Sequence, residues 1–302
     1  MPFSFSIFDD TDNSTVVNTA PVYDLLEELG LGATKSVWVL RGPGNPGVDI
    51  SGLTLEDPAY LSFVLDLQRR GFEIALHGVQ NGSAERSRIE RGLAEFEAKL
   101  GHPPRLHTNH SRNRDNLYWG PERFASWAVR ELVGANRFGR AVPYAGNRAG
   151  SPYFWGDLAR ARVKYVRNLV FNETNLNRVN PSMPYHDPRK PYVPYWFSGT
   201  DGGDVQRFCA ALSEQRQDEL EAEEGVCIMY AHFASGFAPD GKVDARFAQL
   251  MRRLAGKAGT LLPVGALLDK LLVERGGGAI SRAELGRMEW RWLLQRLARG
   301  GS

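Results

Sequence analysis

The chain has 302 residues, of which 42% are hydrophobic and 24% charged, and its formal net charge is +2. This is the composition of a globular protein, and without a block of Lys or Arg it excludes the usual electrostatic signature of nucleic-acid binding. No apolar run is long enough to cross a bilayer, so we expect no membrane partner. The N-terminus has no signal-peptide pattern, and Cys209 and Cys227 have neither metal nor disulfide spacing. We therefore expect a cytoplasmic protein with reduced thiols.

The first element is a predicted strand over residues 3–8, in which aromatic and small residues alternate. It ends in three carboxylates, Asp9, Asp10 and Asp12, which a buried strand would deliver to a solvent-facing rim. Three acids within four residues repel one another unless a cation lies among them, and a metal ion is the usual solution. The alternative is a solvated turn that caps the next helix.

Strands and helices then alternate. Helices are predicted over about 19–29, 57–70 and 83–100, each followed by glycine, and strands over 36–40, 72–76 and 105–107. Strands separated by helices of this length predict a parallel sheet, either open or closed into a barrel.

The middle of the chain breaks this alternation. Residues from about 140 to 202 are rich in Pro, Tyr, Trp, Asn and Gly, with one clear strand at 163–171. We expect this segment to be a long irregular insert that overhangs the functional site, because such inserts in compact domains are usually functional.

Regular elements return after the predicted insert. They are a charged helix over about 204–223, a buried strand over 225–231 that ends on His232, and helices near 243–256 and 263–274. A glycine break at 276–278 then precedes a last helix with a capping box, Ser281-x-x-Glu284. We expect one domain over residues 1–275 and a C-terminal helix within 276–302 that packs back onto it. A homodimer contact is the alternative for this helix.

Histidines recur at predicted strand ends. His77, His107, His110 and His232 follow strands, and they are four of the six histidines in the chain. A single histidine after a strand is usually structural, but four of them together with a carboxylate cluster favour a metal site. Imidazole and carboxylate are ligands for zinc or a similar divalent ion, with one position left open to water.

These motifs resemble, in order, those of the NodB-homology polysaccharide deacetylases, which form carbohydrate esterase family four. Phe8-Asp9-Asp10 matches the opening motif, and His77-Gly-Val-Gln-Asn81 matches a His-x-x-x-His pair with Asn in the second position. The strand that ends at His232 matches the closing motif, although Phe233 replaces the acid that usually follows. The stretch from 107 to 120 is a looser match to the motif that shapes the pocket. The resemblance covers residues 3 to about 275 and implies a distorted (β/α) barrel.

The resemblance also implies a site. Asp9 would be the catalytic base and His232 the general acid, while Asp10 and His77 would bind a divalent metal. His110 is favoured as third ligand over Asp12 or Asn81, because the amide oxygen of Asn is a poor zinc ligand. The metal would be Zn, with Co, Ni, Mn or Mg as alternatives, and the substrate an acetylated sugar or glycan. The residues expected to contact the substrate are Asn81, Asn109, Arg114, Trp119 and Trp196, with further aromatic faces from Trp155, Tyr185 and Tyr192.

Two alternatives belong to other functional classes. Asp10-x-Asp12 after a strand is typical of magnesium phosphatases of the haloacid-dehalogenase type, and residues 199–204 could imitate their later acidic motif. Against this, no apolar strand leads cleanly into Asp201. The other alternative is a carbohydrate-binding protein on a decayed deacetylase fold, in which Asn81 marks lost catalysis.

Overall fold

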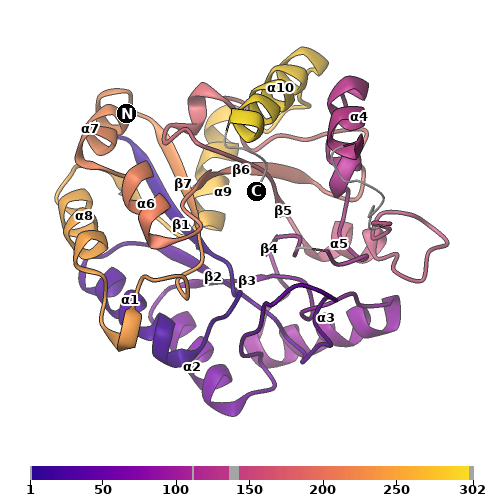
Figure 1. Ribbon diagram of the computed structural model, residues 1–302, viewed down its shortest axis with the longest axis horizontal. Coiled ribbons are helices and arrows are strands. Elements are labelled where there is room, and N and C mark those ends of the chain that lie inside the picture. Colours follow the sequence, from indigo (N-terminus) through magenta and orange to yellow (C-terminus); the bar gives the residue numbers. More distant parts are fainter. Residues whose placement is uncertain (1, 111, 136–142, 299–302) are drawn as a thin grey trace.

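The fold is a closed barrel of seven parallel strands, seen in a computed structural model that describes residues 2–110, 112–135 and 143–298 (Figure 1). The ring closes because β1 pairs with both β2 and β7, and a short β8 lies along β1. The predicted (β/α) barrel is thus confirmed. The strands are β1 (Ser4–Asp9), β2 (Ala33–Val37), β3 (Glu73–Leu76), β4 (Leu106–His107), β5 (Tyr165–Phe171), β6 (Tyr195–Asp201), β7 (Val226–Ala231) and β8 (Thr260–Leu261).

Helices surround the barrel, as the alternating sequence pattern predicts (Figure 1). Parallel strands are covered on both faces, which explains why every residue of β1 is buried and why it is so rich in aromatic residues. The helices are α1 (Val16–Glu28), α2 (Pro58–Arg69), α3 (Arg86–Leu100), α4 (Trp127–Ala135), α5 (Gly156–Arg162), α6 (Val205–Ala211), α7 (Glu214–Ala222), α8 (Ala245–Ala255), α9 (Val264–Arg275) and α10 (Arg282–Ala298). None of the described helices is long and apolar enough to cross a membrane.

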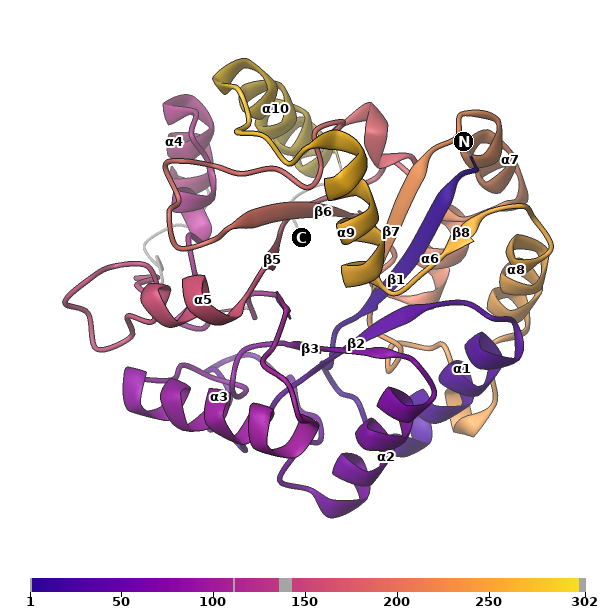
Figure 2. The same ribbon diagram turned by 180° about the vertical axis from the view of Figure 1, so that it is seen from behind.

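Helix α9 lies across the amino-terminal end of the barrel (Figure 2). Its first backbone N–H groups donate to Thr34 Oγ1 at 2.9 Å and to Glu73 Oε2 at 2.7 Å, at the starts of β2 and β3. Further along, the Asp269 carboxylate accepts hydrogen bonds from Lys164 and from the Tyr165 hydroxyl, at the start of β5. This end of the barrel is therefore covered, and the opposite, carboxyl end is the one where loops are free to form a site.

The segment expected to be an irregular insert, about 140–202, instead contains two barrel strands, β5 and β6; its residues 140–142 lie outside the described residues. β6 could not be predicted from the sequence, because its second half is not an apolar run; these residues are Ser198, Gly199, Thr200 and Asp201. These polar groups are buried yet satisfied: Asn180 donates to Ser198 Oγ, and Thr200 donates to the carbonyl of Glu173. We expected no strand to lead cleanly into Asp201, but β6 ends at this residue.

The last helix, α10, completes the helical layer beside β5. Between β5 and β6 the chain forms only one short 3₁₀ turn, Leu176–Arg178, so no helix of its own covers this part of the barrel. α10 buries Leu285, Met288 and Leu293, and its Glu289 carboxylate accepts the backbone N–H groups that precede α4. Trp290 and Leu294 stay exposed on its outer face, and the homodimer remains a prediction.

Candidate metal centre

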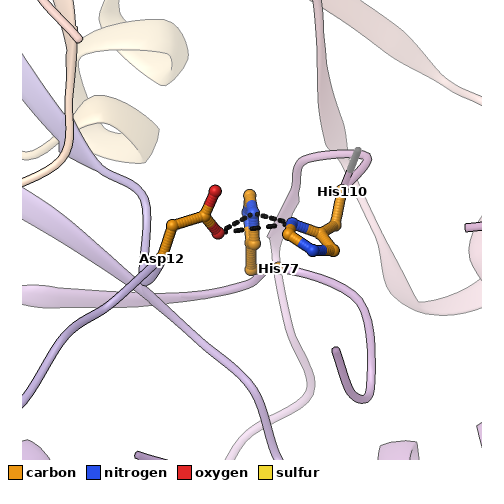
Figure 3. Close-up of side chains that lie close together, drawn as sticks. All are labelled: Asp12, His77 and His110. Carbon is orange, nitrogen blue, oxygen red and sulfur yellow. Dashed lines mark hydrogen bonds and ion pairs between the residues drawn. The ribbon is translucent and has the colours of Figure 1, made fainter. Parts of the chain in front are cut away.

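Three ligand atoms from three separate loops meet at the carboxyl end of the barrel (Figure 3). Asp12 lies in the turn after β1, His77 directly after β3 and His110 in the loop after β4. Asp12 Oδ1 is 3.2 Å from His77 Nε2 and 3.3 Å from His110 Nδ1, and the two ring nitrogens are 3.0 Å apart. Ligands bound tetrahedrally to zinc at about 2.0–2.1 Å would lie about 3.3 Å from one another. The spacing therefore fits a divalent ion.

A second observation supports this fit. Asp12 Oδ1 is buried but makes no hydrogen bond of normal geometry to any residue that the structure describes. A buried carboxylate oxygen without a partner is costly, and a cation among the three atoms would remove that cost. The three imidazoles that face Asp12 favour the charged form of its carboxyl group. Burial alone would raise the pKa of Asp12, but His110, His232 and His77 hold it well below its usual value.

Neighbouring side chains orient both imidazoles. His77 Nδ1 lies 2.6 Å from Thr108 Oγ1, which leaves Nε2 facing Asp12. His110 Nε2 lies 3.1 Å from Asn81 Oδ1, and the Asn81 amide nitrogen donates to the carbonyl of Ile50 at 2.7 Å. Because that second bond fixes the amide, Oδ1 must accept from His110 Nε2–H, and Nδ1 is then free to bind a metal. Asn81 therefore supports a candidate ligand.

His232 faces the same carboxylate from the other side. Its Nδ1 lies 3.0 Å from the carbonyl of Gly203, and its Nε2 lies 3.4 Å from Asp12 Oδ2. The Nδ1–H must donate to that carbonyl, so Nε2 is the atom that points toward the centre. Burial would lower the pKa of His232, but the nearby carboxylates Asp12 and Asp10 raise it to about 9. Without a metal, His232 is therefore protonated at neutral pH.

Asp10, expected as a metal ligand, lies outside this group of three. Both of its oxygens accept hydrogen bonds from the Arg167 guanidinium, at 2.9 and 2.5 Å, and Oδ1 is 3.8 Å from His77 Nδ1. Burial would raise the pKa of Asp10, but the charge of Arg167 dominates and lowers it. Arg167 could not be recognised from the sequence, because it lies inside β5 in a run with no other sign of function.

Asp9, the expected base, is fully buried and is not one of the three clustered ligand residues. Its Oδ2 accepts a hydrogen bond from Tyr23 and forms an ion pair with Lys35, both at 2.9 Å, and its Oδ1 accepts the backbone N–H of Phe233 at 2.9 Å. Lys35 is itself fully buried and also donates to Ser14. Lysine within the buried strand β2 was the one signal that could have revealed this partner. The arrangement gives Asp9 a structural environment.

The other predicted residues surround the centre without joining it. His107 lies against Trp155 with its Nε2 3.2 Å from Asn109 Oδ1, and burial lowers its pKa to about 3, so it stays neutral. Asn109 binds both backbone groups of Leu117 and so shapes the loop. Trp196 is only 1% exposed, so the substrate contact expected of it is wrong: it is a core residue.

The further aromatic faces expected to contact the substrate lie mostly in the core as well. Trp155 and Tyr185 are also buried. Arg114 is exposed and lies 4.4 Å over the Tyr153 ring, while the half-buried Trp119 stacks with Arg123 at 3.9 Å. Of the substrate contacts expected from the sequence, Arg114 is exposed, and Trp119, Asn81 and Tyr192 are half-buried, so these four keep surface available for a ligand.

Comparisons with known proteins find similar solved structures but no family model and no curated relative. The chain is similar to solved deacetylase and esterase structures. A putative polysaccharide deacetylase from Mycobacterium smegmatis is 10% identical with a TM-score of 0.49, covering 91% of this chain and 92% of its own. A family 4 acetyl xylan esterase from Clostridium thermocellum in complex with a cobalt ion is 14% identical with a TM-score of 0.40, covering 90% and 91%. A peptidoglycan deacetylase from Bacillus subtilis is 10% identical with a TM-score of 0.41, covering 91% and 94%.

Proposed function

We propose that this protein is a metal-dependent hydrolase that removes acetyl groups from a sugar or glycan. The observation that carries the proposal is the triangle of Asp12, His77 and His110, whose separations of 3.0 to 3.3 Å match those of zinc ligands. His232 faces this triangle at 3.4 Å from Asp12. The order of strand-end motifs, which resembles that of the deacetylases, supplies the acetylated carbohydrate as substrate class.

Asp12, His77 and His110 would hold the ion. Two imidazoles and one carboxylate suit Zn best, with Co, Ni, Mn and Mg as the alternatives. A divalent ion bound there would polarise a carbonyl and lower the pKa of a water molecule. Asp12 thus takes the ligand place expected for Asp10.

Asp10 in turn takes the base role expected for Asp9. The carboxylate of Asp9 contacts Tyr23, Lys35 and the backbone N–H of Phe233, and none of these three contacts leads to the metal centre. Asp10 lies beside His77, and Arg167 keeps its carboxylate ionised, as a proton acceptor must be. His232, protonated on Nε2, would donate its proton to the leaving oxygen or nitrogen of the sugar.

The experiment is acetate release from acetylated chitin and xylan oligosaccharides by the zinc-loaded full chain. His77→Ala and His110→Ala should abolish both turnover and stoichiometric metal. His102→Ala is the matched control, because its imidazole contacts the Pro103 carbonyl and the ring of Phe96 and no residue of the metal centre. Undiminished turnover in His77→Ala would refute the proposal. If the protein bound one zinc per chain but released acetate from none of the acetylated sugars, the carbohydrate-binding function would replace the deacetylase proposal.

The phosphatase alternative is less well supported. It requires Asp10 and Asp12 to act as nucleophile and acid/base on one phosphate, but Asp12 faces three imidazoles. Its magnesium would also leave the imidazoles without a role, since magnesium prefers oxygen ligands. The cytoplasmic location stays a prediction.

A further inference from the structure

A cavity of about 670 Å³ lies between the segment before and within α4, the loop at 187–190 and helix α10. Its lining includes none of Asp12, His77, His110 and His232, so it is separate from the metal centre. Helices α4 and α10 lie next to each other on this side of the molecule (Figure 1), and Glu289 joins them through the N–H groups of Ala125 and Ser126. The cavity thus depends on the C-terminal helix.

Positive charge dominates the lining. Four basic side chains, Arg130, Arg189, Lys190 and Arg282, face it against two acids. Both acids are already engaged with arginines, one outside the lining and one within it. Glu122 pairs with Arg148 at 2.5 Å, and Asp187 Oδ1 accepts a hydrogen bond from Arg189 Nε at 2.7 Å.

Two of these basic side chains have no ion-pair partner among the described residues. Arg130 and Arg282 are exposed, and neither forms an ion pair within residues 2–110, 112–135 and 143–298. They come from different helices, α4 and α10, yet line one hollow. Unpaired cations that face a common concave surface attract an anion there.

The floor contains a buried polar pair that is only partly satisfied. Lys190 Nζ donates to the carbonyl of Arg123 at 2.6 Å and lies 5.0 Å from the Trp196 ring, but it is 3.8 Å from Asp187 Oδ2, too far for a hydrogen bond. Asp187 is fully buried, and its Oδ2 has no hydrogen-bond partner among the described residues. An orphaned buried acceptor is rare in native proteins, and a ligand donor would satisfy it.

We propose that this cavity binds a small polyhydroxylated anion, such as a sugar acid or a sugar phosphate. Its carboxylate or phosphate would bind Arg130 and Arg282, and one of its hydroxyl groups would donate to Asp187 Oδ2. The site does not require the metal centre, so it stands independently of the deacetylase proposal.

Calorimetry on the full chain tests this site with four probes: glucuronate, glucose 6-phosphate, glucose and inorganic phosphate. We expect glucuronate or glucose 6-phosphate to bind, and the stronger of the two identifies the anionic group. Glucose should not bind, and inorganic phosphate should bind at least tenfold more weakly than the better sugar anion, because it lacks the hydroxyl groups of the sugar that would donate to Asp187 Oδ2. Failure of both sugar anions to bind at millimolar concentration would overturn the proposal.

Variants locate the binding. Arg130→Gln and Arg282→Gln change exposed side chains, so the fold should persist, and each should weaken the sugar anion about tenfold. Arg287→Gln, on the same helix but outside this cavity, is the matched control. His77→Ala should lose metal yet keep sugar-anion binding. Unchanged affinity in both Arg130→Gln and Arg282→Gln, or loss of binding in His77→Ala, would contradict the site.

Discussion

Asp9 and Asp12 lie in one short stretch at the carboxyl end of β1, but their surroundings are opposite. Asp9 is wholly buried, and Tyr23, Lys35 and a backbone N–H satisfy its two oxygens. Asp12 has a buried oxygen without a hydrogen-bond partner among the described residues, placed 3.2 and 3.3 Å from two imidazole nitrogens. A carboxylate whose needs the protein meets by itself is structural, whereas one left unsatisfied beside other ligand atoms is suited to bind an ion.

The largest expected effect is on the structural side of this comparison. Lys35→Met would leave Asp9 buried without its cation, and removing one partner of a buried pair costs about 3–5 kcal/mol in the free energy of unfolding. Urea denaturation measures the change. Lys270→Met is the control, because its ion pair with Glu274 is on the surface and such pairs contribute about 1 kcal/mol or less. Equal, small losses in the two variants would show that the Asp9 pair is not structural.

Catalysis distinguishes Asp9 from Asp10. Asp10→Asn should keep the metal but lower the turnover of the folded protein about 10²–10⁴-fold, the contribution of a general base. Both Asp9→Asn and Asp10→Asn should lower the stability of the fold, because each leaves a buried cation without its partner, but the folded fraction of Asp9→Asn should remain active. Acetate release, measured at a temperature where circular dichroism shows each variant folded, separates the two. A folded, zinc-loaded, inactive Asp9→Asn beside an active Asp10→Asn would restore Asp9 as the base.

Asn81 sharpens the comparison on the metal side. Asn81→Ala removes the acceptor that orients His110, and loss of such a supporting group lowers metal affinity about 10–100-fold. A competition titration with a zinc chelator measures this. Asn175→Ala controls for loss of a partly buried amide elsewhere, where the amide binds Glu223 and backbone. If Asn81→Ala bound zinc as tightly as the unchanged protein, the proposed orientation of His110 would be incorrect.

The sequence predicted the barrel and most of the residues around its carboxyl end, because apolar periodicity and strand-end polar residues are local signals. It did not predict which of the carboxylates after β1 would face the metal centre and which would bind other side chains. Asp10 finds its partner, Arg167, 157 positions away, and the direction of each side chain in the turn after β1 depends on such distant contacts. β6 was missed for a related reason, since its buried Ser198 and Thr200 become compatible with a strand only through tertiary hydrogen bonds.

A smaller effect concerns pH and His232. In the metal-free protein its pKa is raised to about 9, above the unfolded value of about 6.5. The protonated form is favoured in the folded state, so His232 adds stability that is fully present below pH 6.5 and is lost as pH rises through 9. The stability difference between the unchanged protein and His232→Ala should therefore shrink over this range. NMR titration should give a high pKa without metal and a lower one with zinc, and a metal-free pKa at or below 6.5 would contradict this account.

Metal content of Asp12→Asn and Asp10→Asn tests the central claim most directly. Each purified variant is incubated with equimolar zinc, dialysed and analysed for bound metal beside the unchanged protein. We predict one zinc per chain in the unchanged protein and in Asp10→Asn, and little or none in Asp12→Asn, because Asp12 is the carboxylate of the triangle. Zinc retained by Asp12→Asn and lost by Asp10→Asn would contradict the assignment and return the ligand role to Asp10.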